Sequence, residues 1–193
     1  MKNNKSSAIA LILIVIISVI LGIIINSVWN YIETKNHPTS YDEIVKKYSV
    51  EYGGPERVIF ATIKTESSFR SDAVSSAGAM GLMQMMPSTF EWLTSDEHLD
   101  EHLSTDSLFD PEVSIRYGTY YLSYLARKFD YDWTVVSAAY NAGEGRVANW
   151  LEDGKYTDSN GELIKIPIKE TRSYVKKISD AIDTYSRLYP HLT

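Results

Sequence analysis

The feature that most restricts the fold of this chain is an uncharged apolar run from Ala8 to Ile25. As an α-helix the run spans about 27 Å, enough to cross the hydrocarbon core of a bilayer. Lys2 and Lys5 precede it without a balancing acid. The positive-inside rule therefore predicts a single-pass membrane helix, with the first residues in the cytoplasm and everything after Ile25 on the extracytoplasmic side.

The flanks of this run favour an uncleaved anchor over a cleaved signal peptide. The residues that follow, Asn26 to Trp29, lack the small-x-small pattern of a cleavage site. Trp29 and Tyr31 suit the aromatic belt at a membrane–water interface. A cleaved signal peptide stays open as the alternative, and the anchor is the preferred interpretation.

The remaining chain has the length and composition of one folded domain. The 193 residues allow an ordinary core without staples. Cysteine is absent, which excludes disulfides, zinc–thiolate sites and cysteine nucleophiles. The whole chain has a net charge of −6, to which Lys2 and Lys5 contribute two positive charges, so the rest carries −8. This acidity argues against nucleic acid as a partner. We expect an anchor over 1–30, a linker over 31–39 and one domain over 40–193.

Signals for helix starts recur through this domain, which has no internal repeats. Ser40 with Glu43 matches a capping box, and Pro55, Pro87, Pro111 and Asp132 stand where first helical or N-cap residues are favoured. Helices are expected over 40–49, 55–66, from 87 onwards, and over 110–129, 132–139, 144–151 and 168–189. Asn160-Gly161 predicts a turn. The predicted fold is mainly α, with a small hairpin or ordered loop.

Glu66 is the candidate for acid–base chemistry. It lies three positions after Ile63 and seven after Ile59, near the apolar face of its helix, where partial desolvation raises the pKa of a carboxyl. Glycoside cleavage usually needs two carboxylates. Asp72 is the nearby candidate for a second, but an aspartate in such a loop more often forms a turn or faces solvent.

Other catalytic motifs give no support for a cofactor or a metal. The sequence has no Walker loop, dinucleotide fingerprint or Gly-x-Ser-x-Gly elbow. The segment His98-Leu99-Asp100-Glu101-His102 matches the spacing of an inverted zinc-protease motif. Its surroundings lack the apolar periodicity of a buried helix, so we expect a solvated connector over 94–107 and no metal site.

Four short blocks carry a family resemblance. They are Glu-Ser-Ser-Phe at 66–69, Gly-Ala-Met-Gly-Leu-Met-Gln-Met-Met-Pro at 78–87, Ala-Tyr-Asn-Ala-Gly at 139–143 and Ile-Pro-x-x-Glu-Thr-Arg-x-Tyr-Val at 166–175. Together and in this order they resemble the soluble lytic transglycosylases, whose catalytic domain has a goose-type lysozyme-like fold. The resemblance covers about residues 40 to 190 and leaves out the anchor.

The resemblance implies that Glu66 acts as both acid and base on peptidoglycan. It would protonate the oxygen between N-acetylmuramic acid and N-acetylglucosamine, then accept the proton of the muramoyl C6 hydroxyl as that oxygen attacks C1. The product is a 1,6-anhydro sugar. This reaction needs no second carboxylate, in agreement with the single well-placed acid in the sequence.

The resemblance also assigns residues that contact the substrate. Ser75 matches a serine near the acetamido group, and Gln84 matches a glutamine that binds the sugar. Met86 and Thr89 match further cleft positions, and Glu170 matches an acid that contacts the substrate. Tyr140 matches the tyrosine that hydrogen-bonds the catalytic glutamate, and Asn141 belongs to the same block. Glycan strands and the membrane are the expected partners, and no cell-envelope machinery is specified. Two alternatives stay open: a hydrolytic lysozyme of the same fold, in which Asp72 or another acid activates water, and a silent glycan-binding scaffold.

Overall fold

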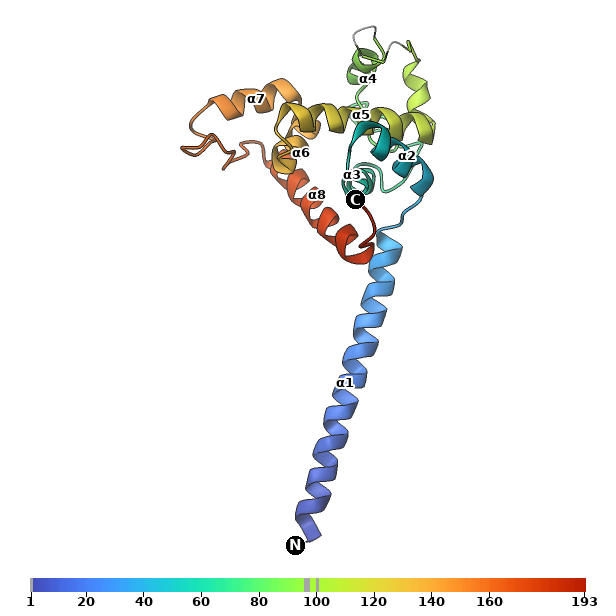
Figure 1. Ribbon diagram of the computed structural model, residues 1–193, viewed down its shortest axis with the longest axis vertical. Helices are drawn as coiled ribbons and strands as arrows, with labels where there is room; N and C mark the ends of the chain where they lie inside the picture. Colours follow the sequence, from blue (N-terminus) through green and yellow to red (C-terminus); the bar gives the residue numbers. More distant parts are fainter. Residues whose placement is uncertain (1, 96–97, 100) are drawn as a thin grey trace. The chain divides into compact units, whose positions relative to one another are not determined.

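The computed structural model describes residues 2–95, 98–99 and 101–193 (Figure 1). It divides into two compact units, Met1–Pro38 and Thr39–Thr193, which are described separately. The elements are α1 (Lys2–Asn36), α2 (Asp42–Tyr52), α3 (Glu56–Glu66), α4 (Pro87–Leu93), the 3-10 helix η1 (Thr105–Phe109), α5 (Pro111–Lys128), α6 (Trp133–Ala142), α7 (Glu144–Glu152) and α8 (Lys169–Leu188).

The first unit is the long helix α1. Its segment Ser7–Asn36 has a mean hydropathy of 3.5 over its most apolar window. Among the described residues it is the one helix long and apolar enough to cross a membrane. Residues 31–36, expected as part of a polar linker, continue this helix. Pro38 disfavours helical geometry in the residue before it, which explains why α1 ends at Asn36.

The starts of the domain helices follow the predicted local chemistry in most cases. Asp110 Oδ1 accepts hydrogen bonds from the N–H groups of Glu112 and Val113, at 2.8 and 3.2 Å. Asp132 Oδ1 caps α6 in the same way. Proline is the first residue of α4 and of α5. These caps satisfy backbone donors that a helix start leaves without partners, and the mainly α fold is confirmed.

The predicted capping box is wrong. The residue that precedes α2 is Tyr41, in a left-handed conformation with φ 68°, and no side chain caps the helix. Because Tyr41 takes the N-cap position, Ser40 lies one residue too early to bond the first free N–H groups. The predicted helix therefore begins at Asp42 and runs on to Tyr52.

The segment between α7 and α8 is an ordered loop. Within the described residues the structure has no strands here, only one antiparallel bridge between Thr157 and Leu163. Asp158 Oδ1 accepts from the N–H groups of Asn160 and Glu162, at 2.8 and 2.9 Å, and Gly161 has φ 83°. Of the two predicted options, hairpin or ordered loop, the structure has the ordered loop.

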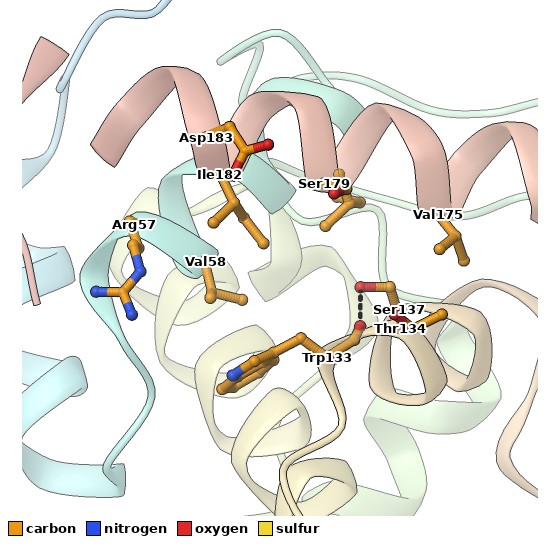
Figure 2. Close-up of a pocket in the computed structure, with 10 residues that line it drawn as sticks. Arg57, Val58, Trp133, Thr134, Ser137, Val175, Ser179, Ile182 and Asp183 are labelled. Atoms are coloured by element: carbon orange, nitrogen blue, oxygen red, sulfur yellow. Dashed lines mark hydrogen bonds between the residues drawn. The ribbon is translucent and has the colours of Figure 1, made fainter. Parts of the chain in front are cut away.

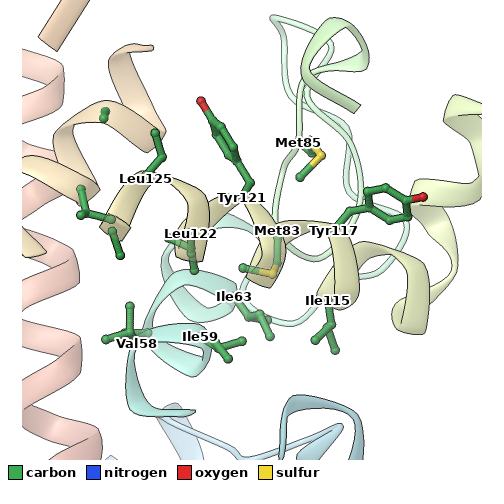
Figure 3. Close-up of a cluster of buried hydrophobic side chains, with 14 of the residues drawn as sticks. Val58, Ile59, Ile63, Met83, Met85, Ile115, Tyr117, Tyr121, Leu122 and Leu125 are labelled. Atoms are coloured by element: carbon green, nitrogen blue, oxygen red, sulfur yellow. The ribbon is translucent and has the colours of Figure 1, made fainter. Parts of the chain in front are cut away.

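The core holds α3 and the loop before α4 against α5. Figure 3 shows Ile59 and Ile63 of α3 facing Ile115 and Leu122 of α5, with Met83 between them. All five side chains are at most 3% exposed. Packing of this kind leaves little room for movement of the chain on either side of Glu66.

Two glycines permit this close packing. A Cβ added to Gly118 of α5 would overlap Met83 Sδ and lie 2.9 Å from Met83 Cβ. A Cβ added to Gly81, which has φ 76°, would overlap the carbonyl oxygen of Leu108. The block at 78–87 can therefore lie on α5 and η1 only with glycine at these positions.

Alanine substitutions at two helical glycines should have opposite effects. Gly118→Ala should lower the free energy of unfolding by about 1–3 kcal/mol, because Met83 must shift. Gly145→Ala, where nothing lies within 4 Å of the added Cβ, should raise it by a few tenths to about 1 kcal/mol. Urea denaturation of the detergent-solubilised chain measures both. Equal stability of the two variants would contradict the packing of Met83 on α5.

Candidate active site

Glu66 is the last residue of α3, and the chain turns sharply after it. Ser68 and Phe69 both have left-handed backbones, with φ 51° and 66°. Such conformations cost about 1–3 kcal/mol each in residues other than glycine. The turn ends the helix at Glu66 and leaves its side chain half-buried.

The environment of Glu66 favours its protonated form. Burial raises the pKa of Glu66 from its ordinary value of 4.5 to about 7. The hydroxyl of Tyr174, in α8, donates a hydrogen bond to Glu66 Oε1 at 2.7 Å and opposes part of this rise. Near neutral pH both the acid and its conjugate base are therefore populated, as a group that first donates and then accepts a proton requires.

The tyrosine bonded to Glu66 is Tyr174, not Tyr140 as predicted. The hydroxyl of Tyr140 donates instead to the carbonyl oxygen of Met83, at 2.8 Å. In the described part of the chain no backbone N–H donates to that carbonyl. The Tyr140 hydroxyl therefore supplies the donor that a buried carbonyl needs. Tyr140 still lies close enough to Glu66 for the charge of that carboxylate to act on it. Burial first, and then this charge, raise the pKa of Tyr140 well above 10.

A pocket of about 210 Å³ brings most of the predicted site residues together. It is lined by Gln84, Met85, Met86, Thr89, Tyr121, Tyr140, Asn141, Ala142 and Gly143. These residues come from the loop before α4 and from α4, α5, α6 and the residue that follows α6. None of them carries a carboxylate.

Gln84 also holds the loop in which it lies. Its Nε2 donates to the carbonyl oxygens of Ala73 and Gly81, at 3.0 and 2.9 Å. Both protons of the side-chain amide therefore bond backbone carbonyls. These bonds fix the amide group, and its oxygen is the atom that can still accept a hydrogen bond from a ligand. The left-handed backbone of Gln84, with φ 46°, is part of the same turn.

Ser75 and Glu170 are not among the residues that line this pocket. Ser75 Oγ accepts a hydrogen bond from the N–H of Ala79 at 2.9 Å, which closes a turn. Glu170 is exposed in the first turn of α8. Asp72 is exposed as well, in the turn after α3. The structure therefore brings five of the eight predicted site residues onto one pocket, with Glu66 near Tyr140.

Sequence reasoning missed the roles of two tyrosines. Tyr174 belongs to the block at 166–175 but is not among the residues that the resemblance assigns to the site. Tyr121 lines the pocket, with its ring centroid 5.5 Å from that of Tyr140. Both positions follow apolar helical spacing, so the sequence pattern alone does not separate a site tyrosine from a core tyrosine.

The predicted connector over 94–107 is more firmly packed than expected. Glu101 forms a two-pronged ion pair with Arg116, at 2.9 and 2.6 Å, and accepts a hydrogen bond from Tyr117. The ring of His98 packs against Trp92, with centroids 4.1 Å apart. Asp100 lies outside the described residues. In the described ranges no group of three or more His, Asp or Glu side chains could hold a metal ion.

The helical fold and the half-buried glutamate place the domain among lysozyme-like helical domains. Residues 43–162 match the model of the transglycosylase SLT domain. The chain belongs to this family.

Named relatives extend the likeness beyond the family model. The chain is 35% identical over 167 residues to the soluble lytic murein transglycosylase of Escherichia coli K12, covering 86% of this chain and 26% of that protein. It is 31% identical to the membrane-bound lytic murein transglycosylase C of Salmonella paratyphi B, covering 88% of this chain and 52% of that protein. The chain thus spans about a quarter to a half of the length of these relatives.

A solved structure supports the same fold. The lytic transglycosylase Slt of Pseudomonas aeruginosa, in an inactive variant with one glutamate changed to glutamine, aligns with a TM-score of 0.69 and 36% identity. The alignment covers 78% of this chain and 24% of that one.

Removing the hydroxyl of Tyr174 should raise the pKa of Glu66. Tyr174→Phe loses a bond that stabilises the carboxylate, so the pKa should move above about 7. Tyr140→Phe, whose hydroxyl bonds Met83, serves as the matched control and should leave that pKa nearly unchanged. Titration of the glutamate carboxyl by ¹³C NMR measures both. A larger shift in Tyr140→Phe would contradict the assigned bonds.

Glu66→Gln should stabilise the domain, increasingly so as pH rises. Because the pKa of Glu66 is raised in the folded state, stability linked to its proton is present below about pH 4.5 and is lost as pH rises to about 7. At pH 8 the variant should exceed the wild type by up to about 3 kcal/mol, whereas at pH 4 the two should unfold alike. Urea denaturation at both pH values tests this. A difference in unfolding free energy that does not grow with pH would indicate that the Glu66 carboxyl is solvated in the folded chain.

Proposed function

We propose that this domain is a peptidoglycan lytic transglycosylase. It cleaves the β-1,4 bond between N-acetylmuramic acid and N-acetylglucosamine and leaves a 1,6-anhydro end, with Glu66 as the single acid and base. The observation that carries the proposal is a half-buried carboxyl with its pKa raised to about 7, close to a pocket whose lining contains no second carboxylate. The relatives are named lytic murein transglycosylases, which supports cleavage of peptidoglycan.

The reaction proceeds by two proton transfers at one carboxyl. Protonated Glu66 gives its proton to the glycosidic oxygen as the bond from C1 breaks. The resulting carboxylate then takes the proton of the muramoyl C6 hydroxyl while that oxygen bonds to C1. The N-acetyl group of the substrate stabilises C1 between the two steps, a substrate-assisted route known among glycosidases. The carboxyl ends protonated, ready for another cycle, and neither a metal nor a cofactor takes part.

Tyr174 and the pocket prepare this chemistry. The hydrogen bond from Tyr174 orients the carboxyl, and burial keeps the first proton on it. Gln84, Met86, Thr89 and Asn141 are proposed to contact the sugar on the pocket side. Ser75 and Glu170 are proposed to contact substrate outside that pocket, and Tyr140 supports the wall of the cleft through Met83.

A hydrolytic lysozyme of the same fold is the nearest rival. It needs an acid that activates water, which is Asp72 or another carboxylate near the bond. Asp72 is exposed and does not line the pocket. The arrangement therefore favours the C6 hydroxyl of the substrate as the nucleophile.

We also propose the location of the domain. Residues 1–30 form an uncleaved single-pass anchor, 31–39 connect it to the domain, and 40–193 are the catalytic domain on the extracytoplasmic side. The apolar helix α1 and the membrane-bound relative support membrane attachment. Lys2 and Lys5 before the helix support the orientation. Glycan strands are the substrate, and this placement gives the domain access to them.

Digestion of purified sacculi tests the reaction. The wild-type chain should release 1,6-anhydromuropeptides, identified by mass spectrometry, with a rate that falls above about pH 7 as Glu66 loses its proton. Glu66→Gln should lower the rate by about 100-fold or more. Asp72→Asn, the matched control, should remain active.

Two results would overturn the proposal. Products with reducing ends only, together with a loss of activity in Asp72→Asn, would indicate hydrolysis. Release that is unchanged in Glu66→Gln, or absent from the wild type, would indicate a silent glycan-binding domain.

A further inference from the structure

A groove runs along one flank of α8. It consists of two cavities of about 200 and 500 Å³ that share Thr134, Val175 and Ser179. Tyr174 points to Glu66. Arg172 and Lys176, two residues before and after Tyr174, lie on the other side of the helix at 3.6 residues per turn. None of the residues that line the two cavities lines the pocket beside Tyr140, so the groove is separate from the proposed catalytic site.

The smaller cavity has an apolar floor. Figure 2 shows Val175 and Ile182 of α8 on one side and Val58 of α3 with Trp133 of α6 on the other, all directed into the space between the helices. At its end lie Arg57 and Asp183, one charge of each sign. Such a floor suits small apolar side chains.

The larger cavity has a positively charged rim. Lys165, Arg172 and Lys176 line it, and Lys176 is the one that pairs with a carboxylate, Asp180, at 2.9 Å. In the described part of the chain no carboxylate lies within ion-pair distance of Lys165 or Arg172. Lys169, exposed one turn before Arg172 on the same face, adds a third such cation. These uncompensated charges stand out on a domain whose net charge is negative.

The rim is partly built in advance. Arg172 donates to the carbonyl oxygens of Ile166 and Pro167, at 2.5 and 3.3 Å. These bonds use one terminal nitrogen and hold the guanidinium beside the loop, leaving its other N–H groups for a ligand. A guanidinium held in this way is suited to binding a carboxylate.

We propose that this groove binds a short peptide with free carboxylates, of the kind that peptidoglycan carries on its glycan strands. The peptide lays apolar side chains on the floor and directs its carboxylates to Lys165 and Arg172. The identity of the peptide rests on the proposed function. Because the groove shares no lining residue with the pocket beside Tyr140, the bound peptide belongs to a strand other than the one being cleaved, and it holds the domain on peptide-bearing wall.

Binding of free stem peptides tests the proposal. The probe is the peptide mixture released from sacculi by an amidase, titrated against the full chain in detergent micelles and followed by NMR. The wild type should bind saturably, and more weakly as salt is added. Lys165→Glu/Lys169→Glu should raise Kd by about tenfold. The matched control, Lys46→Glu/Arg127→Glu, makes the same change in net charge at exposed positions on α2 and α5 and should bind as the wild type does.

Kinetics separate this inference from the proposed function. Lys165→Glu/Lys169→Glu should raise KM on peptide-bearing sacculi with kcat unchanged, and should cleave peptide-free glycan strands as the wild type does. Glu66→Gln should bind the peptides normally while losing cleavage. Peptide binding thus tests the groove even in a chain that cleaves nothing.

Three results would overturn the proposal. They are no saturable binding of the free peptides by the wild type, equal Kd values for the groove variant and its control, and equal binding of peptides whose carboxylates have been amidated. Binding of an acidic protein segment without binding of stem peptides would likewise replace the proposed occupant.

Discussion

The partial burial of the Glu66 carboxyl is the constraint on which the rest of the site depends. Burial alone stabilises the protonated acid, and the 2.7 Å bond from Tyr174 stabilises the carboxylate. The two effects oppose each other, and their balance holds the pKa near 7. A fully solvated carboxyl would lose its proton well below neutral pH, and a buried one without a donor would hold its proton too tightly to give it up in the proposed first transfer.

This balance depends on the packing of α3 with α8 and, through Met83, with α5. Glu66 stands at the end of α3, which packs on α8, and α8 supplies Tyr174. The core residues Ile59 and Ile63 fix α3 against α5, while Met83 on Gly118 fixes the loop that carries Gln84. Catalytic geometry is thus a consequence of core packing. The acid works against stability above its ordinary pKa, and the dense core offsets that cost.

Much of the fold could be predicted from local chemistry, and the site only in part. Proline at the first positions of α4 and α5 and the aspartate caps of α5 and α6 act over a few residues, so the sequence shows them directly. The position of Glu66 on an apolar face could be predicted for the same reason. The bond between Tyr174 and Glu66 joins residues 108 positions apart. Which tyrosine reaches the carboxyl depends on the crossing of α3 and α8, which periodicity does not specify.

The helix α8 shows how one element can serve two sites. Tyr174 lies on its buried face, where it meets Glu66, and Arg172 lies on the flank that lines the larger cavity of the groove. A helix with a single polar face would tolerate many exchanges among lysines, arginines and acids on that face. Here Arg172 also bonds the loop at Ile166, so the loop, the rim of the groove and the start of α8 are one connected unit. Tyr174, two residues further along α8 and on its buried side, takes no part in that unit and bonds Glu66 instead.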